Sequence, residues 1–174
     1  MITSTSSSLF SNQTPKDEND EHPRFAASEY VAEIEENALP DTPVRFVDSS
    51  TNREQSNWLT QTFNRVYDYD QGSNGTFVLR LIGEGAENFE ISPSEVINEA
   101  SFIIKVKDSK ALDYEKVKRF QLEIVAIETM PTYDSDLKKE IYSANSQFSS
   151  DEKNIYSSRV RITILVKGGS YRIH

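Results

Sequence analysis

Carboxylate side chains recur in five short motifs of this 174-residue sequence, and their grouping could serve a cation. Two motifs are dense: residues 17–23 read DENDEHP, and residues 68–75 read DYDQGSNG. The three sparser motifs carry Glu36, the pair Asp113 and Glu115, and Glu128. Calcium takes about six to eight oxygen ligands from carboxylates, Asn side chains and backbone carbonyls. These residue types therefore favour calcium over zinc or magnesium.

The second dense motif has the spacing of a turn that gathers ligands. Asp68 and Asp70 stand at alternate positions, so in an extended chain both side chains point to the same face. Gly72 and Gly75 then permit the chain to turn. Each dense motif also has a plain structural explanation, because the first could be a solvated acidic linker and the second an ordinary polar turn. The order of all five motifs must decide between the two interpretations.

Charge and composition narrow the class of partner. The chain has 28 acidic and 19 basic residues, a formal charge of -9, which disfavours nucleic acid or an anionic membrane as the main partner. Cations are the natural counterpart, although an acidic surface can also serve solubility alone. The absence of cysteine excludes disulfides, thiolate metal sites and cysteine nucleophiles.

The N-terminal residues 1–16 are rich in Ser and Thr, and we expect them to be disordered or a linker remnant. Their start, MITSTSSSLF, lacks the basic region and apolar core of a signal peptide. No window approaches the run of about eighteen apolar residues that a membrane helix needs. If the protein acts outside the cell, we expect this chain to be a fragment of a longer one or an unusual isoform.

Short runs of β-branched and aromatic residues predict the fold class. Seven such runs cover residues 30–34, 44–47, 76–82, 89–91, 102–107, 120–127 and 159–166. Several alternate with period two, as where Phe120 and Leu122 flank Gln121, and no segment shows a convincing helical stripe. The pattern predicts an all-β fold: a seven-stranded antiparallel Greek-key β-sandwich of immunoglobulin-like size.

Two polar insertions interrupt the predicted strands, at residues 49–64 and 129–157. Connections of this length in compact domains are either functional or disordered. The first contains Trp58, Leu59 and Phe63, which could cap the core or form an exposed contact patch. We expect the second to bridge the last two strands as a mobile excursion.

Taken in order, the five motifs resemble the calcium-binding motifs of a cadherin repeat. The family pattern is a D-x-N-D linker, Glu-Asn after the first strand, D-x-D-x-G-x-N-G, L-D-x-E, and A-x-D on the sixth strand. The corresponding residues are Asp17–Asp20, Glu36 with Asn37, Asp68–Gly75, Leu112–Glu115 and Ala126–Glu128. The resemblance implies a calcium-binding linker over residues 17–24, a cadherin repeat over residues 25–167 and a tail over residues 168–174.

In that family calcium ions lie between successive repeats and stiffen the ectodomain, so the resemblance implies two groups of ligands. The group facing the preceding junction comprises Asp17, Asn19, Asp20, Asp68, Asp70, Asn74 and Glu128. The group facing the following junction comprises Glu36, Asp113 and Glu115. So many close carboxylates repel one another unless a divalent cation neutralises them.

Two departures from the family pattern affect these expectations. Glu128 stands where the family usually has Asp, so its extra methylene could shift the carboxylate. The final strand continues into GGSYRIH (168–174) rather than into another D-x-N-D linker, so the following junction lacks its linker ligands. We therefore expect weak calcium affinity in the isolated chain.

The resemblance implies a calcium-dependent cell adhesion module rather than an enzyme. Its partners would be neighbouring repeats of the same parent chain and cadherin molecules in cis or trans, whether homophilic or heterophilic. Its place would be the extracellular side of the plasma membrane, within a longer membrane-anchored chain and without membrane insertion by this segment. The sequons at Asn12 and Asn74 are consistent with a secreted glycoprotein.

Two rival functions come from other classes. An enzyme could use Asp113 with Glu115, or Asp68 with Asp70, but the only histidines are terminal and no phosphate loop or serine elbow is present. A calcium-independent β-sandwich could instead bind proteins through its insertions or strand edges. The chain keeps nearly all of the acidic motifs, and this favours the calcium interpretation.

Overall fold

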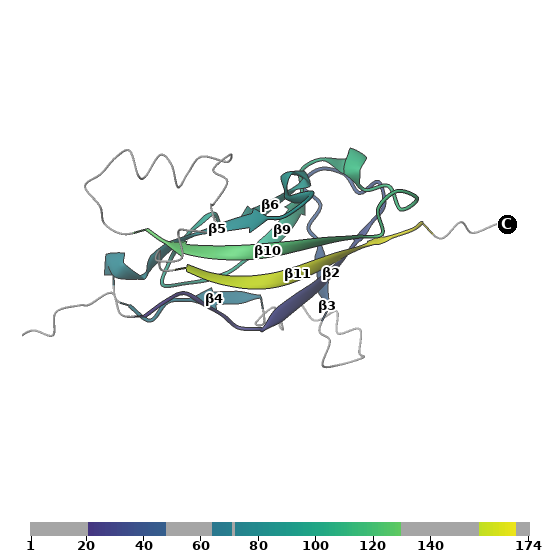
Figure 1. Cartoon of the computed structure of the whole chain (residues 1–174). Coiled ribbons are helices and arrows are strands. Elements are labelled where there is room, and N and C mark those ends of the chain that lie inside the picture. Colours follow the sequence, from purple (N-terminus) through teal and green to yellow (C-terminus); the bar gives the residue numbers. More distant parts are fainter. Residues whose placement is uncertain (1–20, 48–63, 71, 130–156, 170–174) are drawn as a thin grey trace, which may run out of the picture.

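The computed structural model describes residues 21–47, 64–70, 72–129 and 157–169, and these residues are built almost entirely from β-strands (Figure 1). The strands are β1 (Arg24–Phe25), β2 (Glu29–Glu35), β3 (Arg45–Val47), β4 (Arg65–Tyr67), β5 (Thr76–Ile82), β6 (Phe89–Ser92), β7 (Glu95–Ile97), β8 (Glu99–Ser101), β9 (Ile103–Val106), β10 (Arg119–Glu128) and β11 (Ser157–Lys167). Short 3₁₀ helices are η2 (Gly72–Gly75), η3 (Ala86–Asn88) and η4 (Ser109–Ala111). None of the helices in these ranges has the length and apolarity of a membrane span.

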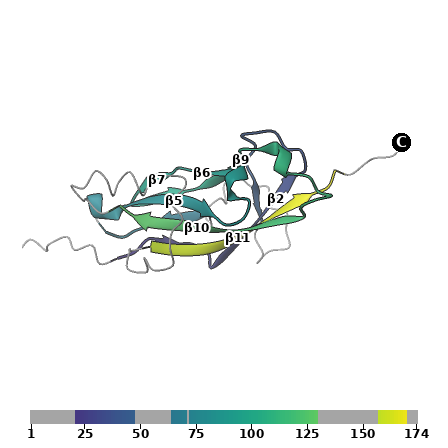
Figure 2. The same ribbon diagram turned by 45° about the horizontal axis from the view of Figure 1, so that its top comes forward.

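The strands form a sandwich around one main core. A six-stranded sheet has the order β3-β2-β11-β10-β5-β7, and the opposing strands form a three-stranded sheet, β1-β4-β8, and a two-stranded sheet, β6-β9. Figure 1 shows β10 and β11 as long neighbouring strands that run along the molecule. In the turned view of Figure 2, β6, β7 and β9 lie to one side of this pair. The two ends of β10 therefore mark the two ends of the sandwich.

The alternation seen in the sequence explains how the long strands bury one face. In β10, Leu122 and Ile124 are buried, whereas Gln121, which precedes Leu122, is exposed. In β11, Ile162 and Ile164 are buried in the same way, and Leu122 pairs directly with Ile162. Apolar side chains from both strands thus reach the core at the same level.

The predicted all-β sandwich is confirmed, and each of the seven predicted runs contains a strand. The pairing is not antiparallel throughout, because β2 and β11 run parallel, with Tyr30 opposite Ile162. The strand count of seven was too low, since β1, β4, β7 and β8 were not predicted. These four strands have only two or three residues each, so the partners they pair with define them more than their own patterns do.

An aromatic cluster joins the two layers. The ring of Phe102 packs edge-on against Phe25, Tyr30 and Phe46, with centroids 6.2, 5.4 and 5.8 Å away. Burial raises the pKa of the Tyr30 hydroxyl to about 12. Such edge-to-face contacts add to the hydrophobic gain from burying the rings, so this cluster anchors the core between β1, β2 and β3.

Both predicted insertions lie mainly outside the described residues, as do Trp58, Leu59, Phe63 and residues 1–16. The residues on either side of the first insertion are hydrogen-bonded to the segment that contains Phe102 and Ile104. The amide of Val44 donates to the carbonyl of Ile104 (2.8 Å), and the amide of Phe102 donates to the carbonyl of Asn64 (3.0 Å). The second connects the paired residues Ile127 and Ser157, at the same end as Glu128.

Candidate metal centre

Asp68 and Asp70 follow β4 in a turn that is held by hydrogen bonds within the turn and to Asn98. The Asp70 amide donates to Oδ1 of Asp68 (2.9 Å), and the Asp68 amide donates to the carbonyl of Asn98 (2.6 Å). The side-chain amide of Asn98 in turn donates to the Asp70 carbonyl. Asn98 has a φ of 61°, a left-handed conformation that asparagine tolerates better than most residues. The turn therefore holds both carboxyl groups in fixed, buried positions, with Asp68 3% and Asp70 4% exposed.

The Asp68 carboxylate is incompletely satisfied by the described residues. Its Oδ2 atom is buried and has no hydrogen-bond partner among them. Burial raises the pKa of Asp68, and the nearby Asp70 charge acts in the same direction, whereas the Asp70 amide and His22 lower it. A buried carboxylate oxygen without a donor is costly, and a bound cation would remove that cost.

The glycine that ends this motif is required by close packing. A Cβ atom at Gly75 would lie 2.6 Å from the Asp70 carbonyl oxygen and would also collide with the Asn98 side chain. Real Cβ atoms do not approach other heavy atoms so closely, so Gly75 lets η2 fold against the turn. Asn74, half-buried, belongs to the same short helix.

Glu128 reaches the same end of the sandwich from another strand. It is the last residue of β10, pairs with Phe77 of β5, and has a fully buried side chain. Its Oε1 lies 3.1 Å from Nδ1 of His22, while the Glu21 amide donates to Oδ2 of Asp70 (3.3 Å). The chain entering β1 therefore passes over both the Asp68–Asp70 turn and Glu128. Asp17, Asn19 and Asp20, which precede it, lie outside the described residues.

Glu36, Asp113 and Glu115 lie at the opposite end. The Glu36 amide donates to the carbonyl of Lys167, the last residue of β11 (2.8 Å), and the next amide, of Asn37, donates to the carbonyl of Leu112 (3.0 Å). The ten residues of β10 separate this end from Glu128, which corresponds to about 30 Å of extended chain. The candidate ligands in the described ranges thus form two groups, one at each end.

Neither group is a complete metal centre on its own. In residues 21–47, 64–70, 72–129 and 157–169, no three His, Asp or Glu side chains converge closely enough to hold an ion. The donors at the Asp68 end are nevertheless of the right kind for calcium, since carboxylates and an Asn amide oxygen are hard oxygen ligands. Further oxygen ligands would have to come from backbone carbonyls or from residues outside these ranges.

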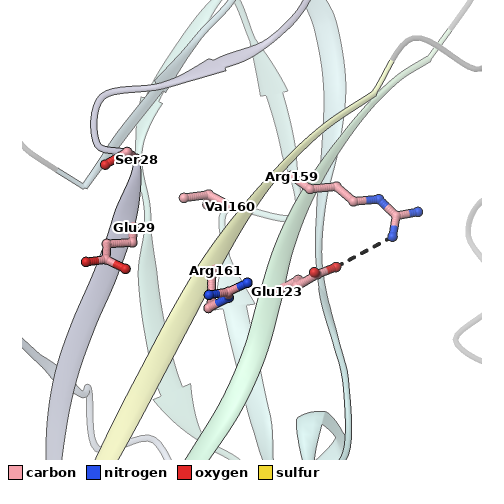
Figure 3. Close-up of a pocket in the computed structure, with 6 residues that line it drawn as sticks. All are labelled: Ser28, Glu29, Glu123, Arg159, Val160 and Arg161. Atoms are coloured by element: carbon pink, nitrogen blue, oxygen red, sulfur yellow. Dashed lines mark ion pairs between the residues drawn. The ribbon is translucent and has the colours of Figure 1, made fainter.

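A polar pocket of about 320 Å³ lies away from both ends (Figure 3). It is lined by Ser28, Glu29, Glu123, Arg159, Val160 and Arg161. Figure 3 shows these residues coming from three neighbouring stretches, β10, β11 and the start of β2, with Glu123 and Arg159 forming an ion pair of 3.5 Å. Its lining contains two arginines and two glutamates but none of the candidate ligands, so the pocket has no part in the cation site.

Sequence reasoning missed the residues that support the site. Asn98 lies 28 residues beyond Asp70 along the chain, and no local pattern connects them. Glu21 and His22 belong to the first acidic motif but were not expected to contact Asp70 and Glu128 directly. The left-handed conformation of Asn98, which asparagine tolerates, is visible only in the structure.

Comparisons with known proteins match this chain to cadherins and cadherin-related proteins. The chain is 38% identical to Cadherin-86C of Drosophila melanogaster over 109 residues, which is 63% of this chain and 5% of that protein. It is 48% identical to Cadherin-related family member 1 of Gallus gallus over 63 residues, 36% of this chain and 7% of that protein. No family model matches the chain. The chain thus spans only a small part of the curated relatives it matches.

A solved structure of protocadherin gamma B7 extracellular cadherin domains 1–4 shares the fold, with a TM-score of 0.50 and 19% identity over 87% of this chain and 25% of that one. The fold defines the class, an all-β cadherin-type sandwich. The sequence matches are to cadherins and cadherin-related proteins, and they support the interpretation of the chain as a cadherin repeat. Because the matched proteins are cadherins, the comparisons support the expectation that the chain is not an enzyme.

Proposed function

We propose that this repeat is a calcium-dependent adhesion module whose Asp68 end binds Ca²⁺ at a junction with a preceding repeat and makes that junction rigid. The observation that carries the proposal is the buried Oδ2 atom of Asp68, which has no partner among the described residues. A folded domain retains such an atom at a cost in stability, and binding of a cation is a direct reason to retain it.

Electrostatics supports the same conclusion. Three buried carboxyl groups, on Asp68, Asp70 and Glu128, lie at this end, and the half-exposed His22 ring lies 3.1 Å from Glu128. Like charges interact strongly where water is excluded, and a divalent ion offsets their repulsion. The proposed ligands at this end are Asp17, Asn19, Asp20, Asp68, Asp70, Asn74 and Glu128. Calcium would supply charge neutralisation here, while the turn around Asp68 would fix the oxygens in place.

The proposed partners follow from the proteins that the chain resembles. The matched segments form 5% to 7% of long cadherins, so we propose that this repeat works beside other repeats of one parent chain. Binding to cadherin molecules in cis or trans, on the extracellular side of the plasma membrane, belongs to the same proposal.

Isothermal titration calorimetry with Ca²⁺, on protein first stripped with a chelator, tests the proposal. We expect saturable binding with a Kd of about 10⁻⁴–10⁻³ M, typical of extracellular calcium modules. Glu128→Gln keeps the shape of a buried side chain but removes its charge, and we expect it to weaken binding about tenfold or more.

Glu123→Gln is the matched control, because Glu123 lies on the same strand but pairs with Arg159 on the outer face. It should leave the Kd unchanged within about twofold. Equal binding by the two variants would contradict the proposed site. No binding in any of the proteins would favour the alternative, a calcium-independent interaction module whose exposed sheet edges include β3 and β7.

A further inference from the structure

The end of the sandwich that carries Glu36 is closed by the chain itself. The Glu36 amide donates to the carbonyl of Lys167 (2.8 Å), and the amide of Gly169 donates to Oε1 of Glu36 (2.7 Å). Residues 167–169 therefore hold both the main chain and the side chain of Glu36. A donor N–H directed at this oxygen occupies a direction from which a cation would otherwise bind.

Close packing explains why two glycines stand at this point. A Cβ atom at Gly168 would lie 2.9 Å from Cδ1 of Tyr114, and one at Gly169 would lie 3.2 Å from Oε1 of Glu36. The Tyr114 ring also holds the Lys118 ammonium, which lies 3.3 Å from the ring centroid. The Gly168–Gly169 segment is thus fitted against Tyr114 and Glu36, and it offers no side-chain oxygen of its own.

Asp113 at this end is also satisfied internally. Its Oδ1 accepts a hydrogen bond from the Glu115 amide (3.0 Å), and its Oδ2 lies 3.4 Å from the Lys116 ammonium. Within the described residues, no buried side-chain oxygen at this end lacks a partner, whereas Oδ2 of Asp68 at the other end does. The two ends therefore differ in whether a buried carboxylate oxygen still lacks a hydrogen-bond or cation partner.

We infer that the repeat is asymmetric toward calcium: the Asp68 end takes the ion, and the Glu36 end is capped by Gly168–Gly169 and does not. The first half rests on the proposed function, and the second goes against the ligand role that the sequence predicted for Glu36, Asp113 and Glu115. Calcium then stiffens one junction only. A junction between this end and a following repeat would therefore contain no bound calcium.

Amide chemical shifts can report on both ends in one experiment. The complete ¹⁵N-labelled chain is stripped with a chelator and titrated with CaCl₂, with NaCl of matched ionic strength as the control. We expect saturable shifts of the amides of Glu21, Asp70 and Asn98. We expect the amides of Gly169 and Glu115 to move no more than in NaCl.

Two variants sharpen the outcome. Asp68→Asn should abolish every saturable shift, because the inference places the ion at the Asp68 end alone, whereas Glu36→Gln should leave the midpoint of the Asp70 shift within about twofold. Saturable shifts at both ends, or shifts at Gly169 that persist in Asp68→Asn, would overturn the inference and leave the proposed function standing. Shifts at neither end would overturn both.

Discussion

The amide of Asp70 donates a hydrogen bond to Oδ1 of Asp68 at 2.9 Å, so the two carboxyl groups of the D-x-D motif belong to one turn. This bond uses one oxygen of Asp68 and leaves the other buried and without a partner in the described residues. The same turn is tied to Asn98 through main-chain and side-chain bonds. The proposed calcium site is therefore part of the folded framework rather than a loose acidic loop.

A methyl group at Gly75 should disturb this framework. Because its Cβ would lie 2.6 Å from the Asp70 carbonyl oxygen, Gly75→Ala should force the turn to move and cost about 1–3 kcal/mol of unfolding free energy. Urea unfolding in the presence of a chelator measures this cost without calcium. Glu95→Ala, at an exposed position of β7, is the control and should change stability by less than about 0.5 kcal/mol. A Gly75→Ala protein as stable as the parent would show that the turn is not tightly packed.

The aromatic cluster makes a second prediction, about the core. Phe102 is fully buried against three other rings, so Phe102→Ala should cost about 3–5 kcal/mol. Its neighbour Ile103 is 36% exposed and points to the other face of the strand, so Ile103→Ala should cost far less. The two variants are compared by thermal unfolding. Similar losses in both would contradict the burial of Phe102 and the exposure of Ile103.

The long strands could be predicted because their own residues alternate. Apolar residues lie at every second position in the first half of β10 and from Val160 to Ile164 of β11, and this alternation does not depend on which strands they pair with. The parallel pairing of β2 with β11 could not be read in this way, because register and direction depend on residues about 130 positions apart. The short strands β1 and β4 likewise depend on each other and not on any local signal.

For the candidate site, the sequence showed the ligand types and not their supports. The alternation of Asp68 and Asp70 was visible, but nothing in the sequence indicated that Asn98 would fasten the turn. At the other end, the sequence showed glycines where linker ligands were expected. The hydrogen bond from Gly169 to Glu36 emerged only from the three-dimensional structure.

Glu33 should make stability depend on pH. Its pKa is lowered, chiefly by the Lys167 ammonium at 2.9 Å and also by Arg45. Because the folded-state pKa lies below the unfolded value, this carboxylate contributes stability above the unfolded pKa of 4.5, and the contribution is lost as the pH falls through the folded pKa. Glu33→Gln should therefore be less stable than the parent at about pH 7, by roughly 0.5–1 kcal/mol, and equally stable at about pH 2.

Urea unfolding at both pH values checks this prediction. Glu35→Gln serves as the control, because Glu35 lies at an exposed position of the same strand. It should have little effect at either pH. A Glu33→Gln deficit that persists undiminished at low pH would mean that packing, and not the charge, stabilises this position.

Thermal unfolding with and without millimolar Ca²⁺, on the parent chain and on Asp68→Asn, tests the central claim most directly. A ligand that binds only the folded state stabilises it by about 1.4 kcal/mol at a concentration ten times its Kd, which corresponds to a rise in Tm of roughly 5 °C. We predict this rise for the parent and none for Asp68→Asn, whose Tm in chelator should equal or exceed that of the parent because a buried charge has been removed. An equal calcium-dependent rise in both proteins, or no rise in either, would contradict calcium binding at Asp68.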